Sequence, residues 1–234
     1  MKDPFGEAIR DYFENGKAPK IKVDSNYTEN EEILPSYFFR TEKEMPLIEQ
    51  KALKLCKGRV LDVGAAAGCH SLILQKKGYN VTAIEISTLA SEILLKRGIQ
   101  RVINKDIFQF NEGNFDTILL LMNGAGIGET LDGLANLLGH LKTLLSPNGQ
   151  ILIDSSDISY LFQEKDGSKW IDLANSNYYG EMLYKVQYKK SAIEFKWLFA
   201  DKDKMEEAAG KAALNFLLTE KGNHYDYLAR LTIR

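Results

Sequence analysis

The stretch Val60-Leu61-Asp62-Val63-Gly64-Ala65-Ala66-Ala67-Gly68 decides the fold of this chain. Its first four residues are apolar apart from Asp62, and such a short run predicts a buried strand. Gly64 and Gly68 then permit a tight turn that brings the backbone close to a ligand, and the helix predicted over residues 69–77 directs its free N–H groups at the same loop. This order predicts a βα unit with a ligand site at its turn, although a plain tight turn gives the same pattern.

The alternation of strand and helix continues beyond this unit. Ser87 is placed to cap a second helix that ends at Gly98, and leucines three and four residues apart predict an amphipathic helix over residues 131–145. Short links between such elements predict a parallel sheet covered by helices on both faces. The further strands predicted in this region are residues 81–84, 101–103, 115–122 and 150–154.

Both ends of the chain depart from this pattern. Phe5, Ile9 and Phe13 have helical spacing, residues 17–32 are polar, and a helix is predicted over residues 46–56. We therefore expect an N-terminal extension or lid over residues 1–45 and a main domain over residues 46–234, with an inserted segment at 155–200. The C-terminal third predicts one hairpin over residues 182–188 and 193–199, a helix over 202–213, and a second hairpin over 215–219 and 225–233.

The composition limits the class of protein. The 234 residues are 44% hydrophobic and 26% charged with a formal net charge of −2, which suits a globular enzyme and argues against a dedicated nucleic-acid surface. The longest apolar run is far shorter than the roughly 20 residues of a membrane-spanning helix. Cys56 and Cys69 form no disulfide framework, so we expect a reduced, cytoplasmic protein without a membrane association.

Two acidic residues follow the next two predicted strands. Glu85 ends the strand at residues 81–84, where a carboxylate can accept both hydroxyls of a ribose. Asp106 follows the third strand with apolar Ile107 beside it, a pair suited to an adenine amino group and its ring. Because the carboxyl ends of adjacent parallel strands share one edge of the sheet, these side chains and the glycine loop are expected to meet in one crevice.

These motifs together resemble those of class I S-adenosylmethionine (SAM)-dependent methyltransferases. The stretch from Asp62 to Gly68 is similar to their first motif, Glu85 and Asp106 to their second and third, and Leu144-Leu145-Ser146-Pro147-Asn148-Gly149-Gln150 to their approach to the fifth strand. The resemblance implies an α/β fold: a three-layer Rossmann-like sandwich with a mostly parallel seven-stranded sheet whose last strand is antiparallel. An N-terminal helical segment and an inserted β-hairpin would be added to this core.

The resemblance also implies a set of cofactor-binding residues. The glycine loop would contact the methionine part of SAM with Asp62 near its amino group, Glu85 would bind the ribose, and Asn123 would lie beside the methyl donor. The asparagine-proline-proline-aromatic signature of amino-methylating nucleic-acid enzymes is replaced here by Asn123-Gly124-Ala125-Gly126, so nucleic acid is an unexpected substrate. The expected cofactor-binding residues are Asp62, Gly64, Ala65, Ala66, Gly68, Glu85, Ile86, Asp106, Ile107 and Asn123.

The candidates for catalysis and substrate binding are chosen only by their position relative to the predicted crevice. Asn123, His70 and Asp154 are the catalytic candidates near the predicted crevice, and each also suits a packing or loop-stabilising role. Aromatic side chains outside the shared core would form an apolar lid over the acceptor, or would instead seal these additions onto the sheet. The expected substrate-binding residues are Tyr37, Phe39, Arg40, Tyr178 and Tyr179. No metal is expected, because the spacing of the three histidines forms no ligand cluster.

The sequence therefore predicts a methyltransferase that uses SAM on a small-molecule acceptor. A non-catalytic SAM-binding module is one alternative, since the motifs concern binding and not turnover. An NAD-dependent oxidoreductase is another, because Glu85 would suit its ribose. The loop has Gly-x-x-x-Gly in place of Gly-x-Gly-x-x-Gly, with Cys69 at the third glycine position, and this spacing disfavours the oxidoreductase.

Overall fold

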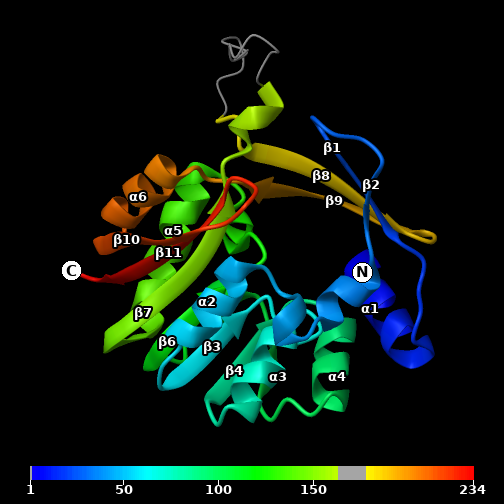
Figure 1. Cartoon of the computed structure of the whole chain (residues 1–234), viewed down its shortest axis with the longest axis horizontal. Helices are drawn as coiled ribbons and strands as arrows, with labels where there is room; N and C mark the ends of the chain where they lie inside the picture. Colours follow the sequence, from blue (N-terminus) through cyan, green and yellow to red (C-terminus); the bar gives the residue numbers. More distant parts are fainter. Residues whose placement is uncertain (1, 163–177) are drawn as a thin grey trace.

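The computed structural model describes residues 2–162 and 178–234, and its centre is a seven-stranded sheet. The strand order is β10-β11-β7-β6-β3-β4-β5, with all neighbours parallel from β7 to β5 and β11 antiparallel to both of its neighbours. The predicted fold class is confirmed (Figure 1). The strands are β3 (Arg59–Val63), β4 (Asn80–Glu85), β5 (Val102–Asn104), β6 (Phe115–Leu120), β7 (Leu145–Ser156), β10 (Leu214–Lys221) and β11 (Asp226–Ile233).

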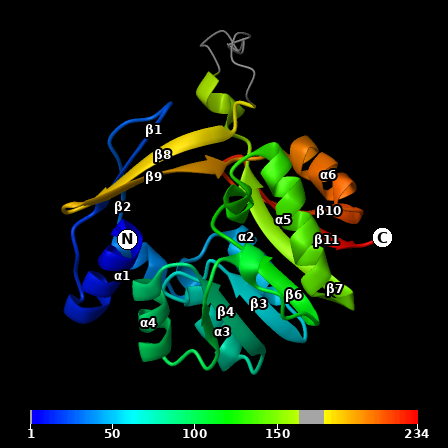
Figure 2. The same cartoon turned by 180° about the vertical axis from the view of Figure 1, so that it is seen from behind.

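Helices cover both faces of this sheet because its strands are apolar on both sides. Leu61 and Ile118 pack in one cluster with the leucines of α5 (Leu131–Leu144) and with α6 (Lys202–Lys211). Val60 and Leu119, whose side chains alternate to the other face, pack with α2 (Leu47–Leu55) and α3 (Cys69–Lys76). Helix α4 (Thr88–Lys96) lies beside α3, and Figure 2 shows α5 in front of β6 and β7.

A second sheet joins the two ends of the chain that depart from the core pattern. Its order is β2-β1-β8-β9, and every neighbouring pair is antiparallel. The predicted hairpin forms β8 (Glu181–Tyr188) and β9 (Ser191–Leu198), while β1 (Ile21–Ser25) and β2 (Glu31–Ile33) come from the polar stretch at residues 17–32. Although this stretch is mostly polar, it forms strands because Ile21 and Val23 alternate to a buried face that the hairpin supplies.

The second sheet arches over the carboxyl ends of the parallel strands (Figure 1). Helix α1 (Pro4–Asn15) supports it from below and packs on α4. Asp3 caps α1 by accepting from Gly6 N at 2.8 Å, and its other oxygen accepts from the hydroxyl of Ser87, which caps α4. The N-terminal segment is thus fastened to the main sheet at the same edge as the predicted crevice.

Several element boundaries differ from those expected. Strand β7 begins at Leu145 and includes the Ser146–Gly149 turn as a register irregularity, because Leu145 already pairs with Phe115 of β6. Strand β6 ends at Leu120, since Met122 and Asn123 adopt left-handed backbone conformations that leave the sheet. Within residues 2–162 and 178–234, no helix has the length and apolar character to cross a bilayer.

Candidate active site

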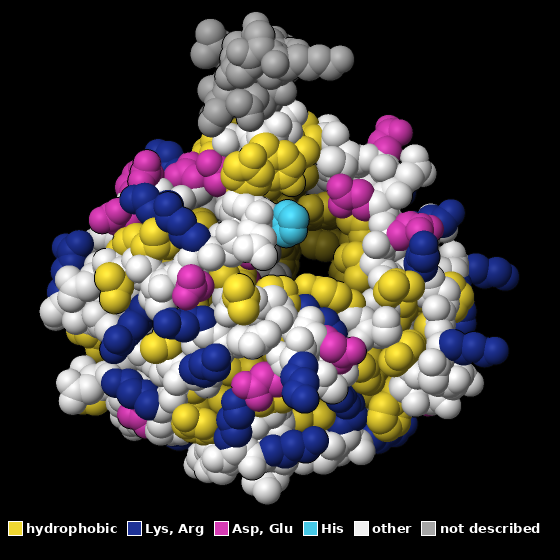
Figure 3. Space-filling view, in the orientation of Figure 1, with side chains coloured by type: hydrophobic (Ala, Val, Ile, Leu, Met, Phe, Trp, Pro, Cys, Tyr) yellow, Lys and Arg dark blue, Asp and Glu magenta, His cyan; other side chains and the backbone are white. Residues whose placement is uncertain are grey.

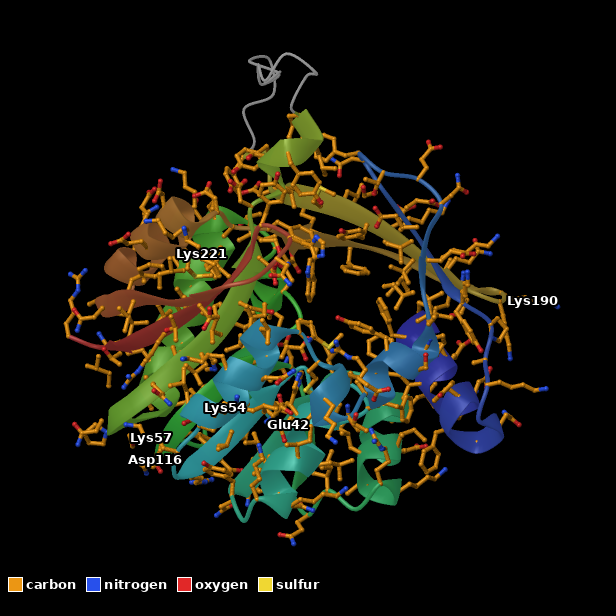
Figure 4. The ribbon with its side chains drawn as sticks, in the orientation of Figure 1. Glu42, Lys54, Lys57, Asp116, Lys190 and Lys221 are labelled. Carbon is orange, nitrogen blue, oxygen red and sulfur yellow. The ribbon has the colours of Figure 1, made fainter. Side chains whose placement is uncertain are left out.

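A cavity of about 840 Å³ lies between the two sheets. Its floor is the carboxyl edge of the parallel strands, and its roof is the inner face of the second sheet. Figure 3 shows the hollow, with hydrophobic side chains in its depth and acidic ones near its rim. Figure 4 places Lys57 and Asp116 at the opposite end of the parallel strands and Lys190 at the tip of the β8–β9 hairpin, so none of the three lies in this space. The volume is in the range of small-molecule sites.

The glycine loop supplies part of the floor. Gly64 and Ala66 line the cavity, with φ angles of 70° and 50°. A Cβ added at Gly64 would meet only Ile127 Cδ1 at 3.8 Å, so this position opens onto the cavity. Ala65 and Gly68 do not line it: Ala65 is buried in the cluster with Leu94, and a Cβ at Gly68 would lie 2.5 Å from Leu94 Cδ2. Gly68 therefore serves close helix packing.

Glu85 lies at the end of β4 on the cavity wall. Its Oε2 accepts a hydrogen bond from Ala66 N and its Oε1 accepts one from Ser87 N, each at 2.8 Å. Burial raises the pKa of this carboxyl, and the backbone N–H groups oppose that shift. Each oxygen keeps a second lone pair for a ligand hydroxyl. Ile86, beside it, is 71% exposed and also lines the cavity.

The third predicted motif also reaches the cavity. Asp106 lines it while accepting from Phe108 N at 2.9 Å, which caps the short helix at Ile107–Gln109. Ile107 is buried at the same wall and offers an apolar contact. A carboxylate and an aliphatic side chain are thus adjacent, as an adenine would require.

Asp62 lies behind the cavity and not on its wall. Its side chain alternates to the face of β3 that α3 covers, where its Oδ2 accepts from the Ser71 hydroxyl at 2.5 Å. Burial raises the pKa of Asp62. Asp62 is thus not among the cavity-lining residues, and its expected place near the ligand amino group stays a prediction.

His70 and Arg40 belong to a buried ionic cluster beside Asp62. Both oxygens of Glu49 accept from Arg40 Nη2 at 3.0 Å, and Glu49 Oε2 lies 2.6 Å from His70 Nε2. Burial opposes protonation of His70, yet contacts with Cys69, Glu49 and Asp62 raise its pKa well above the ordinary value. Neither His70 nor Arg40 lines the cavity. The physical reason is that a buried charge needs a partner, and Glu49 is that partner for both.

Asp154 holds the loop that follows β6. Its two oxygens accept from Met122 N at 3.1 Å and from Gly124 N at 2.9 Å. Burial raises the pKa of Asp154 to about 6, against the effect of these hydrogen bonds. Asp154 does not line the cavity, and a catalytic role for it stays a prediction.

Asn123 lines the cavity between floor and roof. Its Nδ2 donates to the carbonyl oxygen of Leu198 at 3.0 Å, which ties the end of β6 to the end of β9. Its Oδ1 is buried and has no hydrogen-bond partner among the described residues. Because the roof holds the Asn123 amide in place, its Oδ1 is suited to orienting a ligand in the cavity.

The expected substrate-binding aromatics are only partly at the site. Tyr37 lines the cavity and covers the guanidinium of Arg40, whose Cζ lies 3.5 Å from the ring centroid. Phe39 turns away to pack against Tyr12. The hydroxyls of Tyr178 and Tyr179 donate to Asp201 at 2.7 and 3.1 Å, away from the cavity wall. Trp170, another aromatic of the expected lid, lies outside the described residues.

The roof contains aromatic residues that the sequence interpretation did not single out. They alternate along the hairpin and continue into its exit, and the period-two pattern around Lys189-Lys190-Ser191 could have identified them as one face. What the sequence could not show is that this face covers the glycine loop. The roof aromatics that line the cavity are Tyr184, Phe195, Trp197 and Phe199. Among the residues described, no group of His, Cys, Asp or Glu is arranged to hold a metal ion.

A family described as methyltransferase domain matches residues 31–203. The chain belongs to this methyltransferase family. It is similar to a SAM-dependent methyltransferase from Bacteroides fragilis, solved in complex with S-adenosyl-L-homocysteine, with 41% identity over 99% of this chain and 95% of that one and a TM-score of 0.92. The CcbJ methyltransferase from Streptomyces caelestis shares the fold at 13% identity, covering 83% and 99% of the two chains with a TM-score of 0.64.

Curated relatives of this methyltransferase match over shorter regions. A 23S rRNA (uracil(747)-C(5))-methyltransferase from Pyrococcus horikoshii is 34% identical over 33% of this chain. Ribosomal RNA small subunit methyltransferase C from Alcanivorax borkumensis is 27% identical over 51% of it. These matches span 19% and 37% of the two relatives, so the shared part is limited to a portion of each.

Proposed function

We propose that this methyltransferase transfers a methyl group from SAM to a small-molecule acceptor. The observation that carries the proposal is the cavity of about 840 Å³, which combines the glycine-loop floor with an aromatic roof. The complex of the Bacteroides fragilis protein with S-adenosyl-L-homocysteine supports the choice of cofactor.

The residues of the floor fit this cofactor. A Cβ at Gly64 would project into the cavity, so the absence of a side chain there lets a ligand approach the backbone. Glu85 has unused lone pairs for the ribose hydroxyls, and Asp106 with Ile107 suits an adenine. We therefore assign Gly64, Ala66, Glu85, Ile86, Asp106 and Ile107 to the cofactor, while Asp62, Ala65 and Gly68 shape the loop from behind.

SAM supplies an electrophilic methyl group on a sulfonium, so the protein's main task is to align the acceptor with it. Asn123 and Tyr37 line the cavity between floor and roof, where they would orient the acceptor. The roof covers this space with apolar side chains, and positioning of two reactants can lower a barrier by several kcal/mol. His70 and Asp154 act in this proposal through the shape of the site and not as proton acceptors, because both are engaged behind the wall.

The roof also favours a small molecule over nucleic acid. A polyanion needs basic side chains along an open surface, whereas this cavity is lined mainly by apolar side chains and carries Glu31 and Glu32 at the roof. The two ribosomal RNA methyltransferases match only part of the chain. A cytoplasmic location, expected from the cysteines, stays a prediction; both Cys56 and Cys69 are buried free thiols.

Calorimetric titration with S-adenosylhomocysteine, with NAD as the comparison ligand, tests the cofactor. We expect micromolar binding of the first and none of the second. A screen of small-molecule acceptors, with S-adenosylhomocysteine release as readout, then tests turnover. Tight cofactor binding without turnover across a broad screen would favour a non-catalytic SAM-binding module, and absence of binding would refute the proposal.

A further inference from the structure

We propose that the acceptor carries a cationic amine beside an apolar or aromatic body, and that Glu31 binds the amine. This inference rests on the proposed function and specifies the substrate class of the same cavity. It comes from the inner face of the second sheet, which is the part of the cavity wall left over when the cofactor floor is set aside.

The register of the second sheet defines that inner face. Residues directly opposite on neighbouring antiparallel strands share a face, so the pairs Val23–Glu31, Val23–Val186 and Val186–Ile193 lie in one row. Tyr184 pairs with Phe195 in the next row. All of these residues line the cavity, which fixes this face as the roof.

Glu31 is the single charged side chain in these rows of the described sheet. Glu31 lies opposite Val23 and is exposed, so its carboxylate is charged and accessible at the rim of the roof. Glu32 is different, because Lys20 Nζ donates to its Oε2 at 2.5 Å. No ion pair within residues 2–162 and 178–234 involves Glu31, so its charge is free to meet a ligand cation.

Aromatic rings lie on the same cavity-lining face as Glu31. Burial raises the pKa of the Tyr184 hydroxyl to about 12, with the negative charge of Glu31 contributing, which places the carboxylate in electrostatic reach of this ring. The rings of Tyr184 and Phe195 have centroids 6.1 Å apart, and Phe195 and Trp197 meet edge to face at 5.9 Å. A carboxylate beside aromatic faces is the chemistry that attracts an ammonium group.

The mouth of the cavity accounts for the apolar part of the acceptor. Leu34 is 54% exposed and Tyr37 41% exposed, although both line the cavity. Large apolar side chains left open to solvent around a hollow indicate a surface that a ligand covers. Lys105 and Asp106 also line the cavity, and they belong to the segment after β5 that is assigned to the cofactor.

Binding to the protein saturated with S-adenosylhomocysteine tests the inference. The probes are three ring systems (phenyl, indole and naphthyl), each with the same two-carbon chain ending in an amine, a hydroxyl or a carboxylate. We expect at least one amine to bind about fivefold or more tightly than its hydroxyl and carboxylate counterparts, on the scale of a hydrogen bond to a charged group. Glu31→Gln should remove that preference.

Glu194→Gln is the matched control, because Glu194 lies opposite Lys185 on the other face of the same sheet. It should keep the preference for the amine. Equal binding of amines and hydroxyls, no binding of any amine, or equal effects of the two substitutions would each overturn the inference. Because saturation with S-adenosylhomocysteine is measured first, failure of the cofactor proposal is seen separately from failure of this one.

Discussion

Glu85 Oε2 accepts a hydrogen bond of 2.8 Å from the backbone N–H of Ala66. This contact joins the end of β4 to the glycine loop after β3, and Ala66 is held there with a φ of 50° that alanine rarely adopts. The same carboxylate therefore shapes the loop and faces the cavity. Ligand binding and loop conformation are coupled through one side chain.

Replacing Glu85 tests this coupling. We expect Glu85→Ala to weaken S-adenosylhomocysteine binding by about 1–3 kcal/mol, the scale of hydrogen bonds to a charged group. Glu85→Gln keeps the shape but turns its NH2 group toward one of the two backbone donors, Ala66 N or Ser87 N, so it should also weaken binding. Calorimetric titration measures both, and an unchanged affinity in the alanine variant would refute the ribose contact.

Gly64→Val should block the cofactor while leaving the fold in place. The new side chain would project into the cavity from a residue at φ 70°, with a backbone cost of about 1–3 kcal/mol. Gly78→Val is the matched control, because Gly78 has φ 89° and open space around it but is not part of the cavity wall. Only the first should abolish S-adenosylhomocysteine binding; comparable binding by both variants would place the cofactor elsewhere.

The buried ion pair between Arg40 and Glu49 should be essential for stability. Arg40→Gln leaves Glu49 with a reduced set of charged partners in a buried site, so we expect a loss of about 3–5 kcal/mol in the free energy of unfolding. Lys204→Gln breaks the exposed pair with Glu207 and should cost less than about 1 kcal/mol. Chemical denaturation measures the two; similar costs would show that the cluster contributes little.

Asp154 should make stability depend on pH. Its pKa of about 6 in the folded protein lies above the ordinary 3.8, so the folded state is favoured while the carboxyl is protonated and loses that advantage as pH rises from about 4 through 6. The shift corresponds to about 3 kcal/mol. We expect the free energy of unfolding of the wild type, relative to Asp154→Asn, to fall by this order between pH 4 and pH 7. A difference that stays constant with pH would contradict the assignment.

The roof should control the acceptor and not the cofactor. Trp197 packs against Gly126 beside the end of β6, and we expect Trp197→Leu to lower kcat/KM for the acceptor about tenfold or more through lost aromatic contact. S-adenosylhomocysteine affinity should be unchanged. Tyr179→Phe removes only the hydroxyl that meets Asp157 and Asp201 and should leave both properties intact. A loss of acceptor kcat/KM in Tyr179→Phe but not in Trp197→Leu would place the acceptor site at Tyr179.

The sequence by itself determined the core fold and the floor of the site. The motifs at Gly64, Glu85 and Asp106 lie at the ends of consecutive strands, and parallel strands bring their carboxyl ends to one edge whatever the rest of the chain does. Local pattern therefore predicted a nonlocal site, because the topology of a βα repeat is set by short, right-handed connections.

Only the tertiary structure decided the roof and the role of the buried polar residues. Strands β1 and β8 are far apart in the chain, and their pairing depends on edge hydrogen bonds and burial that no local pattern encodes. Likewise, Asp62, His70 and Asp154 have the residue types of a reactive site, yet strand alternation and helix packing aim them at partners behind the wall. The direction in which a polar side chain points depends on the partner that satisfies its charge, and that partner is supplied by the packed fold.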